Sequence, residues 1–197
     1  ALGGSAEIPY QLSRELAKKE HQVTIYTSDY KITQEYINSL PGVTVHPFKT
    51  WSSVANFYIT PAIINRAKEE VRHFDVIHMH NYRTFQNIVV RYYAKKHNVP
   101  YILSPYGSLS NIMSKRRLKQ VYDTLWGHRL VKDASKLTAM TPTEVEQYKD
   151  LGVEESKIVQ IPNSIDIDEY ERLPVKGTFR KEYGITEEHM VLFLGRI

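Results

Sequence analysis

Apolar residues recur along this chain at two alternating spacings, one typical of helices and the other of strands in a buried sheet. Within residues 5–20, Ile8, Leu12 and Leu16 lie four residues apart, which predicts an amphipathic helix. Short runs rich in β-branched residues predict strands over 22–27, 43–48, 75–80, 100–104, 136–141 and 157–162. Further helices are predicted from residue 60 to 71, over 84–97, over 115–132 and from 141 to 152.

Two of these helices begin at a Thr–Pro pair. Thr60 is predicted to be an N-cap, and Pro61 follows in the first turn. The segment from Thr141 to Glu144 predicts a capping box, in which each of these two side chains accepts a backbone N–H of the first turn. Gly152 is predicted to end that helix.

Strand and helix alternate about every 12 to 15 residues, and this spacing requires crossover connections between parallel strands. The sequence therefore predicts an α/β fold, a Rossmann-like parallel sheet with helices on both faces. In such sheets a ligand lies beyond the carboxyl ends of the strands. The candidate contacts that follow strands are His80, Asn81, Tyr106, Gly107, Ser108 and Asn163.

Both ends of the sequence resemble interrupted elements. A glycine loop opens the chain with no strand before it, so we expect the first strand of the sheet to be missing. The apolar run 190–197 predicts a strand with nothing after it. Pro174 and Gly177 mark a link between domains. We therefore expect an amino-terminal domain over 1–175 and, over 176–197, a linker and the start of a truncated second domain.

Composition and net charge limit the kinds of molecule that this protein is expected to bind. The 197 residues are 42% apolar and 24% charged, which is typical of a globular protein. The net charge of +4 falls short of a nucleic-acid-binding signature, but it allows attraction to phosphates or to an anionic membrane surface. Cysteine is absent, which excludes disulfides and thiolate metal sites. No run approaches about 18 apolar residues and no signal peptide is visible, so no membrane span is predicted.

Two motifs resemble metal sites, and the sequence around each favours another role. His78 and His80 lie two apart on a strand and point to one side, as two ligands of one metal do. No third ligand is evident nearby, which favours packing for His78 and a place at the crevice for His80. Asp166 and Asp168 form a DxD pair, but no buried strand runs directly into it, which favours charge at a helix start. We predict no metal.

Other motifs of nucleotide binding and hydrolysis are missing. Neither GxGxxG nor the P-loop pattern occurs, which disfavours a dehydrogenase and a P-loop kinase. No GxSxG elbow is present, and Ser104 and Ser108 have no evident histidine and aspartate beside them. Gly3 and Gly4 precede a helix whose N–H groups could face a phosphate or sugar oxygen, although such a pair is also common in tight turns.

The predicted helix 115–132 combines an apolar stripe with basic residues. The stripe residues are Leu118, Val121, Tyr122, Leu125 and Trp126, and the basic ones are Lys115, Arg116, Arg117, Lys119, Arg129 and Lys132. One interpretation is a helix that lies on an anionic membrane surface, from Lys115 to Lys132. The other is a surface helix whose apolar stripe meets the sheet. The predicted fold favours the second, because its helices must bury one face.

Taken together, four segments resemble the family-4 glycosyltransferases of the GT-B fold. They are GGSAEIPYQLSRELAKKEHQVTIYT near the start, DVIHMH at 75–80, TPTEVEQYKDLGVEESKIVQIPNSIDIDEY from Thr141, and the terminal VLFLGRI. The resemblance spans nearly the whole chain. It implies one half of a GT-B two-domain architecture, whose amino-terminal Rossmann-like domain holds the acceptor while the second domain holds the donor nucleotide.

The resemblance implies a retaining, metal-independent glycosyltransferase of hexosyltransferase type, which uses a UDP- or GDP-sugar as substrate and no cofactor. A saccharide or a lipid-linked molecule would be the acceptor, and no nucleic acid would be involved. By position, Gly3 and Gly4 would approach the donor diphosphate or the acceptor, and Arg196 would be the donor-phosphate cation. His80 and Asn81 would line the acceptor side.

One loop departs from the family pattern. Many relatives carry a histidine after the fifth strand, beside the reacting sugar, whereas this loop reads SPYGSL and places Tyr106 there. Tyrosine donates a hydrogen bond but supplies no cation near neutral pH. Tyr106 is therefore the candidate catalytic residue, with a turn residue as the alternative. The family's glutamate pair and lysine belong to the second domain, so we expect the isolated fragment to be inactive.

Two other functions stay open. One is a GT-B nucleotide-sugar epimerase, which releases no glycoside, and the other is a non-catalytic module that binds sugar or lipid. A cytoplasmic location, with contact to the inner face of the membrane, is expected because export signals are missing and the implied donor is intracellular.

Overall fold

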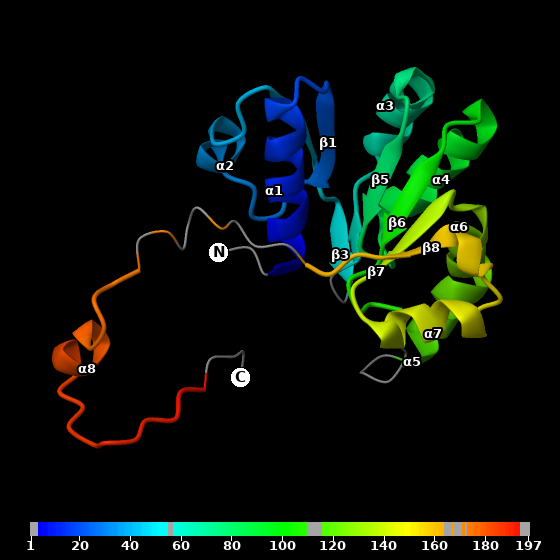
Figure 1. Cartoon of the computed structure of the whole chain (residues 1–197). Helices are drawn as coiled ribbons and strands as arrows, with labels where there is room; N and C mark the ends of the chain where they lie inside the picture. Colours follow the sequence, from blue (N-terminus) through cyan, green and yellow to red (C-terminus); the bar gives the residue numbers. More distant parts are fainter. Residues whose placement is uncertain are drawn as a thin grey trace. The chain divides into compact units, whose positions relative to one another are not determined.

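The structure is a computed structural model that describes residues 4–54, 57–109, 116–163, 167, 171 and 173–193 (Figure 1). It divides into two compact units, Ala1–Asn163 and Ser164–Ile197. The strands are β1 (Val23–Ser28), β2 (Val43–Phe48), β3 (Ser52–Val54), β4 (Phe57–Ile59), β5 (Ile77–His80), β6 (Tyr101–Ser104), β7 (Lys136–Ala139) and β8 (Ile158–Gln160). The α-helices are α1 (Gly4–Lys18), α2 (Gln34–Asn38), α3 (Ile63–Glu70), α4 (Phe85–His97), α5 (Arg116–Tyr122), α6 (His128–Asp133), α7 (Pro142–Asp150) and α8 (Thr178–Glu182). Three short turns of other helix types are η1 (Val71–His73), η2 (Asp123–Gly127) and η3 (Glu155–Lys157).

The sheets confirm the predicted parallel arrangement. Strands β5, β6, β7 and β8 form a four-stranded parallel sheet in sequence order, and β1 pairs in parallel with β2 (Figure 1). Helix α1 packs against the β1–β2 pair and α7 against β7 and β8, while α4 packs against both α3 and α6. The chain therefore has the Rossmann-like α/β architecture of a parallel sheet flanked by helices.

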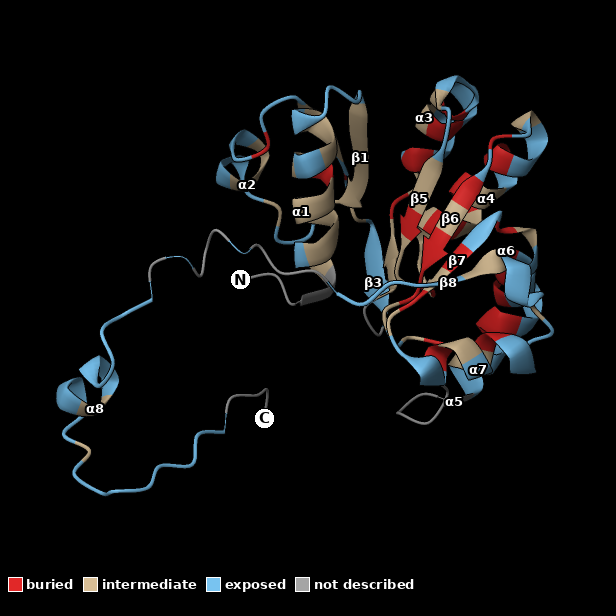
Figure 2. Ribbon diagram, in the orientation of Figure 1, coloured by how far each residue is buried: buried red, intermediate tan, exposed pale blue. Residues whose placement is uncertain are grey.

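The core of the first unit lies between β5–β7 and the helices around them, where Figure 2 shows the buried residues. Leu103 and Leu137 are fully inaccessible on adjacent strands, and Ile63 of α3 is equally buried. Central parallel strands are covered on both faces, which explains why they read as continuous apolar runs. In the second unit no described residue is buried.

Two local predictions are wrong. Thr60 does not cap α3: the N-cap is Ala62, without a side-chain hydrogen bond, and the Thr60 hydroxyl instead accepts a hydrogen bond from Gln86. Residues 190–193 of the strand predicted over 190–197 form no strand and are exposed, and no described strand pairs with them, while 194–197 lie outside the described residues. The antiparallel β3–β4 hairpin and the short α2 were not predicted, because each is too short to show a hydrophobic period.

The predicted helix 115–132 also differs from expectation. It consists of α5, the π-helical turn η2 and α6, and the N–H of His128 bonds to the carbonyl of Asp123, five residues earlier. A π-turn shifts the helical register, so a stripe drawn at the α-helical period no longer faces one side. The residues that turn inward are Tyr122, Asp123, Gly127, Leu130 and Val131.

The predicted stripe therefore mostly faces outward. Leu118 and Val121 are 60% and 55% exposed, and Leu125 and Trp126 are also exposed. Of its five residues only Tyr122 meets the core, which overturns the favoured interpretation of that stripe. Among the described helices none is long and apolar enough to cross a bilayer.

Candidate functional site

The carboxyl ends of β5 and β6 bring two of the predicted loops together. His80, the last residue of β5, stands beside Ser104, the last residue of β6, in the parallel register. The amide of Asn81 donates to the carbonyl of Ser104 at 2.8 Å, which extends the pairing by one residue. Asn81 has a φ of 64°, a left-handed conformation that asparagine tolerates, and the chain turns there out of the sheet.

A histidine and a tyrosine meet at this edge. The Nδ1 atom of His80 lies 2.7 Å from the Tyr106 hydroxyl, and the two rings lie nearly parallel at 9°, with centroids 5.8 Å apart. When His80 carries its proton on Nε2, the Tyr106 hydroxyl donates to Nδ1. The predicted position of Tyr106 in the crevice thus comes with a specific partner.

A second set of polar side chains continues the network into the sheet. The Nε2 atom of His78 is 2.7 Å from the Ser104 hydroxyl, which is itself 2.5 Å from the hydroxyl of Thr138 on β7. Ser104 therefore has a histidine partner, contrary to expectation. With only 2% of its surface exposed, however, Ser104 links strands rather than facing a substrate.

Burial keeps this network uncharged. It lowers the pKa of His78 from 6.5 to about 4, and that of His80 to about 3, to which the neighbouring His78 contributes. It also raises the pKa of Tyr106 to about 12, although a hydrogen bond with Ser104 partly offsets the rise. At neutral pH the site therefore offers hydroxyl and imidazole hydrogen-bonding groups, and no charge of its own.

The loop after β6 has an unusual backbone. Tyr106 and Gly107 are consecutive residues with φ of 52° and 75°, both in the left-handed region. Glycine adopts this conformation freely, whereas a tyrosine does so at a cost. The side chain of Ser108 accepts a hydrogen bond from the Tyr82 amide at 3.2 Å and donates to the carbonyl of Pro105. The turn is thus tied both to itself and to the loop after β5.

Glu144 reaches this loop from α7. The predicted capping box forms only in part: Thr141 is the N-cap and accepts from the Glu144 amide, but the Glu144 carboxylate does not return to Thr141. Instead it accepts hydrogen bonds from the amides of Gly107 and Met140, the latter at 2.6 Å. The motif located Glu144 correctly, and only the three-dimensional structure shows its partners.

Arg83 and Asp123 form a buried ion pair beside the same loop. Their contacts are two parallel hydrogen bonds, from Nε to Oδ1 at 3.0 Å and from Nη2 to Oδ2 at 2.7 Å. The Arg83 guanidinium also donates to the carbonyls of Ser108 and Leu109. Neither residue was singled out from the sequence, since an Arg and an Asp forty residues apart show no local pattern.

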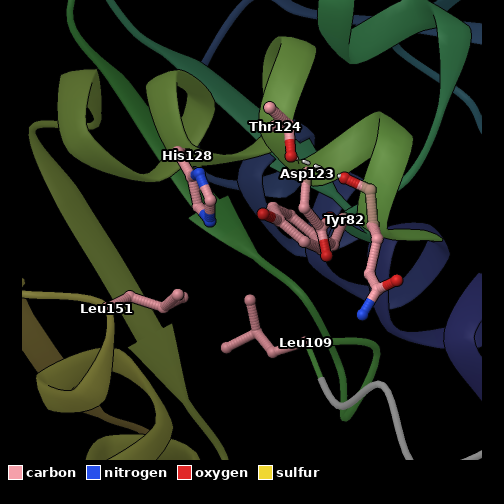
Figure 3. A pocket seen from close by; sticks show the side chains of 7 residues that line it. Tyr82, Leu109, Asp123, Thr124, His128 and Leu151 are labelled. Carbon is pink, nitrogen blue, oxygen red and sulfur yellow. Dashed lines mark hydrogen bonds between the residues drawn. The ribbon is translucent and has the colours of Figure 1, made fainter. Parts of the chain in front are cut away.

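The π-turn brings Asp123 into place and leaves room for Tyr82. A Cβ atom at Gly127 would lie 2.3 Å from the Tyr82 hydroxyl oxygen, so only glycine fits there. A cavity of about 160 Å³ opens beside this contact (Figure 3). Its lining residues are Tyr82, Leu109, Gln120, Asp123, Thr124, His128 and Leu151.

The predicted site residues thus fall into three groups. The structure places His80, Asn81, Tyr106, Gly107 and Ser108 in the adjoining loops after β5 and β6. Asn163 is exposed and follows the edge strand β8, which β6 and β7 separate from β5. Gly4 is the first residue of α1, whereas Gly3 and Arg196 lie outside the described residues, as do Asp166 and Asp168. In the described part of the chain no three acidic, histidine or cysteine side chains gather as metal ligands.

Comparisons with known proteins agree with this architecture. The chain is similar in fold to crystal structures of HepE from Anabaena in complex with UDP-glucose, with UDP and glucose, and with UDP. The TM-scores are 0.66, 0.65 and 0.66, each at 14% sequence identity over 93% of this chain. The matched region is 47% of the HepE chain, so this chain spans about half the length of that protein.

No curated protein sequence matches the chain significantly. The model of one family does match, however, and it covers residues 2–169. That range holds all the strands found among the described residues and both loops of the candidate site. The chain therefore belongs to Glycosyltransferase Family 4.

Proposed function

We propose that this chain is the acceptor-side domain of a retaining, metal-independent hexosyltransferase, which moves a sugar from a UDP- or GDP-sugar to a saccharide or lipid-linked acceptor. Family membership and the fold shared with HepE, whose structures hold UDP-glucose or UDP, support transfer from a nucleotide sugar. The observation that carries the proposal is the neutral His80–Tyr106 pair at the carboxyl ends of β5 and β6.

The chemistry needs two kinds of group. Departure of a nucleoside diphosphate leaves negative charge on its oxygens while the anomeric carbon becomes cationic. Gly3, Gly4 and the start of α1 would offer N–H groups to that charge, and Arg196 a cation. On the acceptor side, His80 and Tyr106 would hold sugar hydroxyls by hydrogen bonds without placing a positive charge beside the developing cation. The donor half would begin near residue 176.

The test is a nucleotide-sugar screen on a protein that contains this chain together with a donor-binding half. Release of nucleoside diphosphate is measured with and without candidate acceptors, and acceptor-dependent release is expected. Tyr106→Phe should lower that release, whereas Tyr92→Phe, at an exposed tyrosine of α4, should not. Residues 1–197 alone should show no transfer.

Two outcomes would contradict transfer. A folded protein that releases nucleoside diphosphate from no donor would favour a non-catalytic sugar- or lipid-binding module. If the sugar of the donor were altered and no glycoside formed with any acceptor, the result would favour an epimerase. Either result would leave the fold and the family unchanged.

We further propose that the outward stripe of α5 and η2 docks on the anionic inner face of a membrane. Leu118 and Val121 of α5 and Leu125 of η2 are exposed, and exposed basic residues flank them in sequence, Arg117 on α5 and Arg129 on α6. This arrangement favours a lipid-linked acceptor and a cytoplasmic protein peripheral to the membrane.

Vesicle binding tests the docking. Binding to anionic vesicles should fade as salt is added, since screening weakens attraction to the surface. Charge reversal at Arg117 should weaken it too, as should Leu118→Ser. Equal binding to neutral and anionic vesicles would contradict the proposed docking.

A further inference from the structure

The backbone of Tyr106 needs an explanation, because a non-glycine residue in the left-handed region stores strain. Such a conformation persists only when the surrounding structure fixes it from several sides, and it is often found at functional sites. The Tyr106 side chain itself is engaged through its hydroxyl at His80. The Ser108 amide and hydroxyl donate to the carbonyl of Pro105 and close the turn from within, and further groups hold it from outside the loop.

Glu144 is one such group. Only 4% of its surface is exposed, and its two carboxylate oxygens are taken by two different backbone amides, those of Gly107 and Met140. Gly107 is the residue directly after Tyr106, and Met140 lies in the loop after β7. One buried side chain therefore ties the loop that carries Tyr106 to the neighbouring strand.

Arg83 holds the other end of the same turn. Its guanidinium donates to the carbonyls of Ser108 and Leu109 and is itself oriented by Asp123. The backbone is thus fixed at three consecutive residues after Tyr106. Ser108 bonds to Pro105 from within the turn, whereas Glu144 reaches Gly107, the residue after the tyrosine, from another element.

We propose that Glu144 is a positioning residue: by holding the Gly107 amide, its carboxylate keeps Tyr106 in the left-handed conformation and the Tyr106 hydroxyl on His80. The role in catalysis rests on the function proposed above, whereas the positioning itself rests only on the contacts described. Glu144 is buried with both carboxylate oxygens engaged by backbone amides, so it acts through Tyr106.

The chemistry at this position requires a carboxylate of this length. Both partners of Glu144 are N–H donors, and only an ionised carboxylate presents acceptors on both sides. Glutamine would turn an NH2 group towards one of the two amides, and so leave a buried donor unpaired. Aspartate keeps the charge but is one methylene shorter, so it would not reach both amides.

The first test is an NMR titration of the His80 ring in the chain, in the wild type and in Glu144→Gln. In the wild type the imidazole of His80 should stay neutral well below pH 6.5, because burial and the neighbouring His78 lower its pKa. In Glu144→Gln the released turn should expose the ring, and its pKa should rise by about one unit or more. The matched control is Glu146→Gln, on the same helix and 69% exposed, which should leave the titration unchanged.

A purely structural role would give a different result. The variant would then lose stability, as measured by urea unfolding, while His80 titrated as in the wild type. That result would overturn the positioning role.

The second test is a double-mutant cycle in a protein with both halves. Glu144→Gln should lower kcat about tenfold or more when Tyr106 is present, since small misplacements of a reacting group cost large factors in rate. In a Tyr106→Phe background the same change should cost less than about twofold, because the hydroxyl to be positioned is gone. Equal losses in both backgrounds would overturn the proposal. Absence of transfer in the wild type would refute the proposed function alone, and the His80 titration would still decide the positioning.

A third measurement avoids the risk that Glu144→Gln fails to fold. In the wild-type chain the Gly107 amide should exchange with solvent slowly although Gly107 is exposed, because Glu144 holds it. Exposed Gly177 serves as the reference. Exchange of Gly107 as fast as that of Gly177 would overturn the proposal.

Discussion

Two polar clusters involve the loop after β6, and one of them is charged whereas the other is neutral. Arg83 and Asp123 are charged, with side chains only 13% and 10% exposed, and their charges are compensated by paired hydrogen bonds. His80 and Tyr106 are partly buried, and burial shifts their pKa values so that neither is charged at neutral pH.

This difference in charge indicates different roles for the two clusters, one in holding the loop and the other in binding a ligand. A buried ion pair is costly to break, because removal of one partner leaves the other as an unpaired charge. A neutral pair loses only a hydrogen bond when one partner moves or turns to a ligand. The charged cluster is therefore suited to fix the loop, and the neutral cluster is suited to exchange its hydrogen bond for one with a sugar hydroxyl.

The largest effect on stability is expected from Asp123→Ala. Loss of the carboxylate leaves the Arg83 guanidinium buried beside Tyr82, and should lower the free energy of unfolding by about 3–5 kcal/mol. Urea unfolding of the chain measures it, with Asp75→Ala, at an exposed position, as the control. If the free energy of unfolding fell by less than about 1 kcal/mol, as expected for a surface ion pair, the proposed difference between the two clusters would be wrong.

The next effect is expected from Gly127→Ala, which tests the π-turn that carries Asp123. The new Cβ atom would lie 2.3 Å from the Tyr82 hydroxyl oxygen and 2.9 Å from the ring carbon that bears it. Overpacking of this kind should destabilise the chain by about 1–3 kcal/mol in urea unfolding. Tyr82→Phe removes the nearer atom, so the double variant should recover part of the loss. If the double variant were no more stable than Gly127→Ala alone, the strain would lie elsewhere in the turn.

The sequence predicted the regular part of this fold well. Alternating periods located β5, β6 and β7 within two residues, and the helix predicted over 84–97 is α4, which the structure shows to be capped by the Thr84 side chain. The apolar pattern failed to predict the buried side of helix 115–132. That side holds Asp123 and Gly127, which no apolar pattern marks as core. An ion pair and a close tyrosine make those two residues interior, and both depend on tertiary contacts.

The sequence indicated which loops carry the candidate residues, but it did not indicate their hydrogen-bond partners. The rule that ligands lie beyond the carboxyl ends of parallel strands indicated His80 and Tyr106, which do meet. It also indicated Asn163, which follows the far edge strand, because the rule does not give the order of strands. Glu144 was visible only as part of a helix cap, since its partner Gly107 lies 37 residues away.

The neutral cluster should make stability depend on pH. The pKa values of His78 and His80 are lowered to about 4 and about 3 in the folded chain, so below 6.5 the unfolded chain binds more protons. Stability should therefore fall as the pH decreases from 6.5 to 5, by about 1–2 kcal/mol for each histidine. Urea unfolding at both pH values measures the fall.

His80→Gln is the matched test of that dependence. The variant keeps a polar side chain but cannot titrate, so it should lose about half of the difference in stability between the two pH values. An unchanged difference would assign the pH dependence to other groups. The two partly buried histidines would then not be the neutral counterpart of the ion pair.

The smallest effect is expected from Tyr106→Phe, which removes one neutral hydrogen bond and leaves the stacked ring. The loss in free energy of unfolding should be about 0.5–1.5 kcal/mol, because a neutral pair exchanges its bond for one with water at little net cost. Tyr92→Phe, at an exposed tyrosine, is the control and should leave stability unchanged. If Tyr106→Phe were to cost as much as Asp123→Ala, the hydroxyl would be part of the support of the loop, and His80 and Tyr106 would not be free to turn to a ligand. A small cost in stability together with a large loss of transfer would instead assign the hydroxyl to the reaction.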